Sequence, residues 1–595
     1  METSFIAQQF VPIMFAGLLV LLLTGFPVAF SLAATGLLFG VIGMEIGLFP
    51  ASLFQALPLR MFGIMQNDTL LAIPFFTFMG IILERSGMAE DLLETVGQVF
   101  GPLRGGLAIA VILVGALLAA TTGIVAAAVI SMGLISLPIM LRNGYSRVIA
   151  AGAITASGTL AQAIPPSLVL IVLADQLGRS VGDMYAGALV PGLLLVVLYL
   201  IFVIAVALLK PELVPALPLE ARIYKEKNGK SGHRSLLFLV ILCAAIGWGW
   251  SQVHDGLMTS WLDRRMPSAT DEIFIMSMTV ASITGLGLSI ASRTFRLGLL
   301  SRLAEQVTFV LMPPLILIFL VLGTIFLGVA TPTEGGAMGA LGALILSGIK
   351  HRLSYKMVYQ ASENTAKLAT FVMFILIGAT VFSFTFNAAD GHVWVEHLFK
   401  DMPGGGWGFL ISVNLLVFFL GMFIDFFEIA FIVVPLLAPV AEKILPGLVP
   451  GMTADMAMIW FGVILAINLQ TSFLTPPFGF ALFYLRSVAA KTDYTDVVTG
   501  KQIRAISTLE IYKGSIAFII LQFFMLAAIM VYPSLVTGTF EKEKKLSKSA
   551  VMDLLESASN ADPLADPNPN SNAGSAVDPM QAIMDANAAD KAKKK

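Results

Sequence analysis

The stretches SGTLAQAIPPS (residues 157–167) and NLQTSFLTPPF (residues 468–478) each place polar residues just ahead of a double proline. Both lie within long runs that contain no charged side chain. Proline lacks a backbone N–H and its ring clashes with the preceding helical turn, so each proline pair predicts an interruption of a helix. The alternative, a kinked packing helix, does not explain why the pattern of polar neighbours occurs twice.

The amino-acid composition indicates that these interrupted helices lie in a membrane. Of the 595 residues, 57% are hydrophobic and only 12% are charged, which is far from the usage of a soluble protein. Apolar runs of about 20 residues, the length that crosses a bilayer, recur along most of the chain. We therefore expect an all-α polytopic membrane protein in the lipid bilayer, with a first apolar run that is retained as a membrane segment.

Other classes of function are disfavoured by what the sequence lacks. The single cysteine, Cys243, excludes intramolecular disulfides and multi-cysteine metal sites. Basic residues occur in short loops and form no face for nucleic acid. No nucleotide-binding loop, metal-ligand cluster or nucleophile with a nearby base stands out. We therefore expect no enzyme and no organic cofactor, and the absence of an ATP motif favours coupling to an ion gradient.

The chain contains an internal repeat. A shift of 311 residues places Ser157 on Asn468, and residues 165–166 on residues 476–477. Two further matches need small gaps: 137–138 with 434–435, at an offset of 297, and 185–187 with 512–514, at an offset of 327. The agreement predicts two structural repeats, each with one broken helix.

The loops indicate that the two repeats have opposite orientations. Residues 45–58 are poor in Lys and Arg, whereas the counterpart at residues 350–356 is rich in them. Because basic loops stay on the cytoplasmic side, the repeats are expected to be inverted. Inverted repeats with broken segments at corresponding positions are typical of secondary transporters, whose site lies near the bilayer midplane at the repeat interface.

The repeat and the charge distribution predict four parts of the chain. These are a first inverted repeat (1–208), a linker with an extra transmembrane hairpin (209–307), a second inverted repeat (308–540) and a disordered polar tail (541–595).

Each repeat also has a candidate hairpin upstream of its break. The uncharged run 107–138 is too long for one ordinary span, and we interpret it as a re-entrant helix-turn-helix with a tip at residues 121–123. The corresponding region, residues 421–425, ends in Asp425, one of few carboxylates at membrane depth. An intramembrane acid is a functional hypothesis by default. The alternative, a helix-end residue that reaches the membrane surface, stays open.

Interrupted helices supply ligand atoms. Each carbonyl left unpaired in hydrocarbon costs a few kcal/mol unless protein, water or a ligand satisfies it. The freed carbonyls and the neighbouring hydroxyl and amide groups are neutral oxygens, the ligand type that suits a dehydrated Na⁺ ion. The site is therefore expected to bind a cation at each break.

The stretches ITASGTLAQAIPPS (154–167), YAGALVPG (185–192), ATPTEGGAMGA (330–340) and NLQTSFLTPPFG (468–479) resemble the large membrane subunit of the tripartite ATP-independent periplasmic (TRAP) transporters. The resemblance covers most of both halves. It implies a bacterial inner-membrane subunit that works with a small four-helix membrane subunit and a periplasmic solute-binding protein. It also implies Na⁺-driven import of solutes that mostly carry a carboxylate, by an elevator movement of a domain that contains both hairpins.

The resemblance and the break chemistry together give the candidate site. The candidate ion-binding residues are Thr121, Thr122, Gly123, Ser157, Thr159, Asp425, Asn468, Ser472 and Thr475. The candidate substrate-binding residues are Pro165, Pro166, Ser167, Gln470, Pro476 and Pro477.

Two features depart from the family pattern. The segment 209–307 and the long tail are absent from typical members and resemble a longer subgroup described as transporting mannitol or chloroaromatic acids. The first hairpin tip has Thr121 and Thr122 where family members often carry serines.

Other interpretations remain open at this point. An ion channel or an ion-translocating subunit of a larger complex is the main alternative, although the few acids at membrane depth form no evident relay. Proton coupling in place of sodium coupling is also open. The residues Thr331, Pro332 and Glu334 are more typical of a helix start than of a ligand set.

Overall fold

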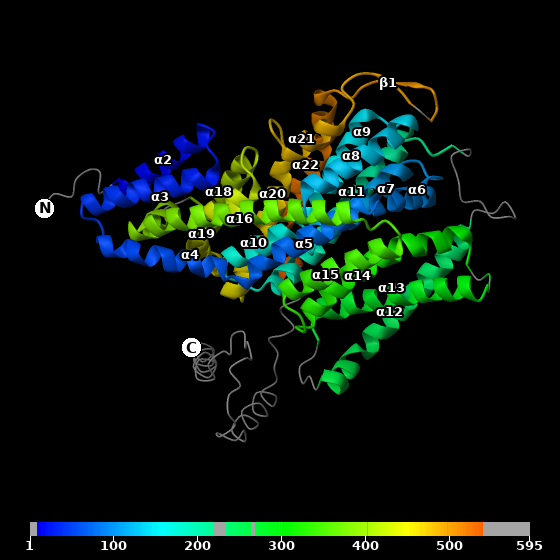
Figure 1. Cartoon of the computed structure of the whole chain (residues 1–595), viewed down its shortest axis with the longest axis horizontal. Coiled ribbons are helices and arrows are strands. Elements are labelled where there is room, and N and C mark those ends of the chain that lie inside the picture. Colours follow the sequence, from blue (N-terminus) through cyan, green and yellow to red (C-terminus); the bar gives the residue numbers. More distant parts are fainter. Residues whose placement is uncertain are drawn as a thin grey trace. The chain divides into compact units, whose positions relative to one another are not determined.

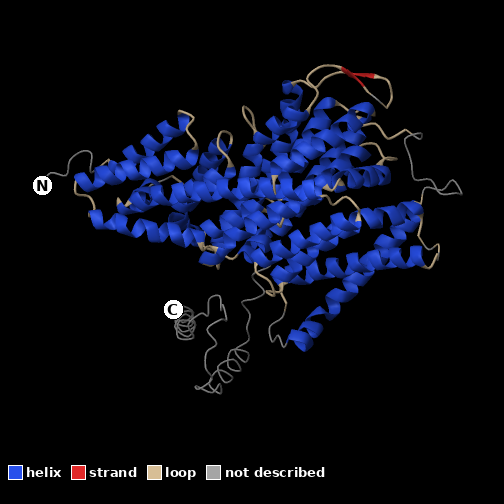
Figure 2. Cartoon of the chain, viewed as in Figure 1, coloured by secondary structure: helices blue, strands red, loops and turns tan. Residues whose placement is uncertain are grey.

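The computed structural model describes residues 9–218, 232–262, 268–296, 298, 300–400, 403–496 and 498–538. These residues are helical almost throughout, and their one sheet is a two-stranded antiparallel ribbon of β1 (Tyr494–Thr495) and β2 (Gln502–Ile503) (Figure 2). The prediction of an all-α protein is confirmed. The predicted tail, 541–595, lies outside the described residues.

The elements follow the chain as Figure 1 labels them. The first half contains α2 (Phe10–Leu23), α3 (Val28–Glu45), η1 (Ala51–Ala56), α4 (Leu57–Met65), α5 (Asp68–Arg85), α6 (Met88–Phe100), α7 (Gly106–Thr122), α8 (Val125–Arg142), α9 (Arg147–Thr159), η2 (Leu160–Gln162), α10 (Leu168–Gln176), α11 (Val181–Leu209) and η3 (Pro211–Leu213). Next come α12 (His233–Leu262) and α13 (Thr270–Thr294). The second half contains α14 (Arg302–Phe326), α15 (Pro332–Ile349), α16 (Tyr355–Ala388), α17 (Gly391–Lys400), α18 (Gly405–Gly421), α19 (Phe426–Ile444), η5 (Leu445–Leu448), α20 (Ala454–Phe473), α21 (Phe480–Val488), α22 (Thr508–Val531) and α23 (Ser534–Thr537).

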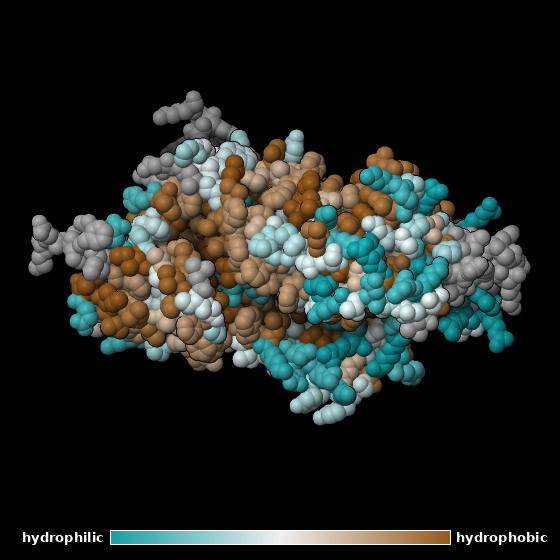
Figure 3. Space-filling model, turned by 90° about the horizontal axis from the view of Figure 1, so that it is seen from above, coloured by the Kyte–Doolittle hydropathy of each residue, from teal (hydrophilic) through white to brown (hydrophobic). Residues whose placement is uncertain are grey.

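The helices confirm a polytopic membrane protein. Within the described residues, ten helices are long and apolar enough to cross a membrane, or up to eleven if one bent pair counts as a single span. Large apolar side chains are exposed along many of them, and Figure 3 shows wide apolar areas on the face that it presents. Such a surface is stable against lipid and would aggregate in water.

The start of α15 has the predicted helix-start chemistry. The hydroxyl of Thr331 accepts a hydrogen bond from the backbone N–H of Glu334 at 3.2 Å, and the Glu334 carboxylate accepts one from the backbone N–H of Thr331 at 2.8 Å. Pro332 occupies the first turn, where its missing N–H leaves no donor unpaired. These residues cap a helix.

The hairpin predicted between the repeats consists of α12 and α13, but both helices are longer than the apolar runs at 236–253 and 273–291. A buried polar contact extends their pairing. His254 Nε2 lies 3.0 Å from a carboxylate oxygen of Glu272, and Trp250 donates to His254 Nδ1 at 3.1 Å. His254 and Glu272 both lie in the parts of α12 and α13 that extend past the apolar runs, so the pair of helices remains in contact there.

Each broken helix packs against the last long helix of the opposite half. A Cβ on Gly152 of α9 would lie 2.2 Å from the carbonyl oxygen of Gly514 in α22, so these helices cross with their backbones in contact (Figure 1). In the other half, Gly187 of α11 lies against Ile459 and Val463 of α20. The sequence repeat pairs Gly152 with Val463 and Gly187 with Gly514, so the two crossings are counterparts.

Candidate functional site

The first proline pair lies in an interrupted helix, as predicted. Helix α9 ends at Thr159, η2 adds one short turn, and α10 begins only at Leu168. The hydroxyl of Ser167 donates to the carbonyl oxygen of Gln162 at 3.0 Å, which bridges the break. All the polar side chains of this segment are buried, so the interruption is inside the protein.

The second proline pair interrupts the other helix in the same way. Helix α20 ends at Phe473 and α21 begins at Phe480. Gly479, just before α21, has φ +46°, a left-handed conformation that glycine adopts without a steric penalty. The peptide bond within each proline pair is cis. Regular α-helix stops at Thr159 and Phe473 and resumes only at Leu168 and Phe480, so both breaks are interruptions, and the interpretation as two kinked packing helices is wrong.

The tip of the first hairpin touches the first break. Helices α7 and α8 are joined at Gly123, whose φ of +60° favours glycine. A Cβ on Gly123 would lie 3.2 Å from the Leu168 side chain and 3.7 Å from the Pro166 carbonyl oxygen. On the other side, the backbone of Thr122 packs directly on Gly80 of α5. The structure thus brings the predicted tip residues and the first proline pair together.

The second hairpin, α18 and α19, meets the second break. A Cβ on Gly421 would lie 2.2 Å from the hydroxyl oxygen of Ser472, and the rings of Phe423 and Phe478 are 5.6 Å apart. Both hairpins therefore place their tips against the break of their own half.

Asp425 is the N-cap residue of α19. Its carboxylate accepts a hydrogen bond from the backbone N–H of Phe426 at 2.7 Å. The carboxylate of Glu428 accepts one from the backbone N–H of Asp425 at 3.1 Å. The helix-end interpretation of Asp425 is therefore correct in its local chemistry, and this helix end lies at the hairpin tip.

Ser157 and Asn468, which the repeat pairs, occupy similar positions against the first helix of each hairpin. A Cβ on Gly115 of α7 would lie 2.4 Å from the Ser157 hydroxyl oxygen. The Asn468 amide donates to the backbone oxygen of Asn414 in α18 at 2.7 Å and to its side-chain oxygen at 2.9 Å. The sequence predicted the pair but not the partner Asn414.

One hydrogen bond joins the two breaks. The amide of Gln470 donates to the hydroxyl oxygen of Thr159 at 3.5 Å, and the two residues are 311 positions apart. That separation equals the repeat offset, so each residue contacts its own counterpart. Equivalent residues of two repeats related by a two-fold axis contact each other only at that axis. Gln470 was predicted to bind substrate and Thr159 to bind an ion, and the structure places them in direct contact.

The hydroxyl groups of the site are arranged as acceptors. Each donates its hydrogen, at 2.8–3.1 Å, to a backbone carbonyl oxygen three or four residues earlier in the chain. The residues are Thr121, Thr122, Ser157, Thr159, Ser472 and Thr475. A hydroxyl has one hydrogen and two lone pairs, so these oxygens retain only acceptor capacity. That arrangement suits a cation.

Several buried amide atoms have no hydrogen-bond partner within the described residues. They are Asn468 Oδ1, Gln470 Oε1, Gln522 Oε1 and both amide atoms of Gln162. All four side chains are fully buried. An unsatisfied buried polar group costs about 1–3 kcal/mol, so each of these atoms needs a partner that the described residues do not supply.

Sequence reasoning missed four of these polar residues: Gln162, Tyr199, Asn414 and Gln522. Gln162 lies inside the stretch that decides the fold, and the other three are isolated polar residues in apolar helices. Polarity at membrane depth was an available signal. What the sequence could not supply was their proximity, because Tyr199 accepts hydrogen bonds from Gln470 at 3.3 Å and from Gln522 at 2.7 Å across long stretches of chain.

We expect Tyr199→Phe to disturb the site through the buried amides of Gln470 and Gln522, which both donate to the Tyr199 hydroxyl. The change removes the acceptor of two buried amides at once, at about 1–3 kcal/mol for each group left unpaired. Thermal unfolding of the purified protein should shift to a lower temperature, and solute uptake should fall. Tyr532→Phe, at a side chain that is 63% exposed, is the matched control. Equal stability of the two variants would contradict a role for this network.

The sequence model of the tripartite ATP-independent periplasmic transporter DctM component matches residues 15–262 and 272–535. The chain belongs to this family. The permease is accordingly a multi-pass inner-membrane protein, as predicted. The two matched ranges extend into residues 209–307 from both sides and leave out residues 263–271 between them.

Several relatives are also named as TRAP transporter permeases. The permease is 26% identical to the C4-dicarboxylate TRAP transporter large permease protein DctM of Pseudomonas aeruginosa, over 78% of this chain and 86% of the relative. It is 23% identical to the sialic acid TRAP transporter large permease protein SiaM of Vibrio cholerae, over 87% and 95%. It is 24% identical to the isethionate TRAP transporter permease protein DctMQ of Oleidesulfovibrio alaskensis, over 80% and 60%.

Among solved structures, the YdaH transporter of Alcanivorax borkumensis aligns with a TM-score of 0.44 and 14% identity. The alignment covers 81% of the permease and 88% of that chain.

Proposed function

We propose that the permease imports an organic anion in symport with Na⁺. The solute would be delivered by a periplasmic binding protein, and the permease would act with a small four-helix membrane subunit. The observation that carries the proposal is the pair of helix breaks, each facing a hairpin tip and lined with oxygens that can only accept.

The cation side of the proposal rests on the hydroxyl and amide oxygens. In each half, the hydroxyls of the hairpin or break have already donated their hydrogens to backbone carbonyls. Asn468 and Gln470 add amide oxygens that no described group satisfies. A cation bound between Thr122 and the first break, or between Ser472 and the second hairpin, would satisfy acceptors that otherwise raise the energy of the fold.

The anion side rests on helix N-termini. Helix α8 begins after Ile124 and α10 after Ser167, and neither has a side-chain cap. Uncapped N-termini present free N–H groups and the positive end of the helix dipole, which favour a carboxylate. Asp425 instead caps α19 with a negative charge. Helix α21, after the second break, also lacks a side-chain cap, but the negative charge of Asp425 at the tip beside that break disfavours an anion there. We therefore assign the solute carboxylate to the first half, and the acidic tip to the cation side.

Cation binding and anion binding are coupled because both involve the hairpin tips. A cation held between hairpin and break would order both tips, and the ordered tip presents the α8 N-terminus to the anion. Each ligand then raises the affinity for the other by the same factor. The elevator movement of a domain that contains both hairpins, predicted from the family resemblance, is part of this proposal.

Reconstitution tests the proposed function. The permease, its small subunit and its binding protein would be placed in proteoliposomes with a binding-protein ligand found by thermal shift against a panel of carboxylates. We expect solute uptake that saturates, needs the binding protein and follows an inward Na⁺ gradient. Uptake driven equally by a pH gradient without Na⁺ would refute sodium coupling, and binding-protein-independent flux would favour a channel.

A further inference from the structure

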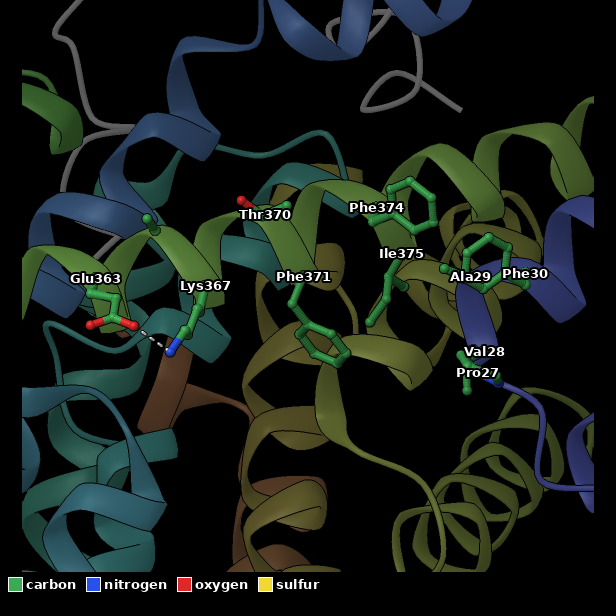
Figure 4. A pocket seen from close by; sticks show the side chains of 11 residues that line it. Pro27, Val28, Ala29, Phe30, Glu363, Lys367, Thr370, Phe371, Phe374 and Ile375 are labelled. Carbon is green, nitrogen blue, oxygen red and sulfur yellow. Dashed lines mark hydrogen bonds and ion pairs between the residues drawn. The ribbon is translucent and has the colours of Figure 1, made fainter.

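A groove lies between the beginning of α3 and the N-terminal half of α16 (Figure 4). It is lined by residues 27–30 and by one face of residues 363–375, and its volume is about 590 Å³. Small-molecule sites occupy about 300–1,000 Å³. None of its lining residues belongs to the breaks or the hairpin tips, so the groove is separate from the candidate transport site.

The groove has an aromatic rim and a buried floor. Phe30, Phe371 and Phe374 are 57%, 44% and 45% exposed, whereas Ile375 and Ala29 are 1% and 7% exposed. The rings of Phe30 and Phe374 meet edge to face at 5.2 Å, which joins the two helices at the rim. Nearly all the lining is therefore apolar, and it suits a hydrocarbon chain.

The groove is closed at one end by direct helix contact. A Cβ on Gly378 of α16 would lie 2.3 Å from the carbonyl oxygen of Ala29. Farther along, the hydroxyl of Thr385 donates to the carbonyl oxygen of Gly36 at 2.8 Å. Because α3 and α16 touch there, an occupant can extend only toward the opposite end.

That opposite end carries one positive and one negative side chain. Lys367 Nζ lies 2.7 Å from a carboxylate oxygen of Glu363, and both side chains are exposed (Figure 4). Residues 368–388 contain no charged side chain and are long enough to cross a bilayer. Lys367 therefore marks the level at which α16 leaves the hydrocarbon, and the basic residues at 350–356 place that level at the cytoplasmic leaflet.

We propose that this groove binds one phospholipid of the cytoplasmic leaflet that carries an ethanolamine headgroup. An acyl chain would lie along Phe371 and Phe374, with the phosphate at Lys367 and the ammonium group at Glu363. A headgroup with both charges complements the pair. A phosphate that binds Lys367 takes away the partner that Glu363 has in the ion pair. The ethanolamine ammonium replaces that partner, whereas a glycerol headgroup carries no positive charge and choline has no N–H to donate.

The groove also has a contact with the candidate site. Phe371 packs edge to face on Phe427 of α19 at 6.4 Å, and Phe427 contacts the ring of Phe426 at 4.0 Å. Phe426 directly follows Asp425, the cap at the second hairpin tip. Only the ring of Phe371 thus separates a bound acyl chain from Phe427 of α19. The bound chain therefore stabilises the packing of α16 on that hairpin helix. Lipid binding itself does not depend on the proposed function.

Native mass spectrometry of the delipidated full chain tests the proposal. Dioleoyl phosphatidylethanolamine, phosphatidylglycerol and phosphatidylcholine would be titrated separately. We expect one ethanolamine lipid to bind several times more tightly than the other two. Thr370→Trp fills the groove and should abolish this binding, whereas Leu341→Trp, at a 60% exposed position on α15, should not. Equal binding of the three lipids, or full binding by Thr370→Trp, would overturn the proposal.

Two charge variants separate the headgroup contacts. Lys367→Gln should weaken ethanolamine-lipid binding about two- to fivefold, the effect of one exposed charge pair. Glu363→Gln should remove the preference over phosphatidylglycerol. A photoreactive side chain at position 374 distinguishes the occupant in membranes. Cross-linking to lipid supports the proposal, and cross-linking to the small membrane subunit in place of lipid would overturn it.

Discussion

Gly80→Ala is expected to reduce Na⁺-dependent uptake about tenfold or more while the protein still inserts into the membrane. The new Cβ would lie 2.5 Å from Thr122 Cα and 2.8 Å from the Thr122 carbonyl oxygen. These are backbone atoms, so no side-chain rotation relieves the overlap, and overpacking of this kind costs about 1–3 kcal/mol. The clash pushes the first hairpin tip out of the position that presents the Thr122 hydroxyl oxygen.

Gly287→Ala is the matched control for this variant. Gly287 lies within α13, and a Cβ there would meet nothing within 4 Å. Alanine is also the better helix former, so stability should stay level or rise slightly. Uptake assays in vesicles, normalised to the amount of permease in the membrane, compare the two. If Gly80→Ala transports as well as Gly287→Ala, the hairpin tip has no role in transport.

Asn468→Ala is expected to raise the Na⁺ concentration required for half-maximal uptake by about tenfold. The change removes an amide oxygen that no described group satisfies, and it takes the donor away from both oxygens of Asn414. Loss of one such ligand or bond is worth about 1–3 kcal/mol, and 1.4 kcal/mol is a factor of ten. The measurement is uptake as a function of Na⁺ at fixed total ionic strength.

A double-mutant cycle distinguishes the loss of an ion ligand from the loss of the hydrogen bonds between Asn468 and Asn414. Asn414→Ala removes the side-chain part of the contact but leaves the Asn468 oxygen in place. If Asn468 is an ion ligand, Asn468→Ala should shift the Na⁺ dependence further in the Asn414→Ala background. No further shift would show that Asn468 acts only by holding α18 against α20. Asn387→Ala, at an exposed asparagine, controls for the loss of any amide.

The sequence predicted the breaks because their cause is local. Proline removes a donor and fills the space of the preceding turn, and polar neighbours accompany the pairs at residues 165–166 and 476–477. The pair Pro313–Pro314 has no polar neighbours and lies inside the continuous helix α14, so the breaks follow from both features together. The hairpin tip at residues 121–123 was predicted for a similar reason, since an uncharged run too long for one span has to turn. The cap at Thr331 likewise depends only on its nearest neighbours.

The remaining features depend on contacts that the chain order does not show. Gln470 meets Tyr199 over 271 positions and Thr159 over 311. Gln522 meets Tyr199 over 323. His254 of α12 meets Glu272 of α13 over 18 positions. A single polar residue in an apolar helix shows that something is needed nearby, but only the folded structure identifies the partner.

The most direct measurement is equilibrium binding of radioactive ²²Na⁺ to the purified permease. We predict saturable binding that K⁺ does not displace, with one component lost in Thr122→Ala and a different component lost in Ser472→Ala, because Thr122 lies at the first hairpin tip and Ser472 lies in the second broken helix. Binding that does not saturate, or that is unchanged in both variants, would contradict the claim that the two interrupted helices hold cations.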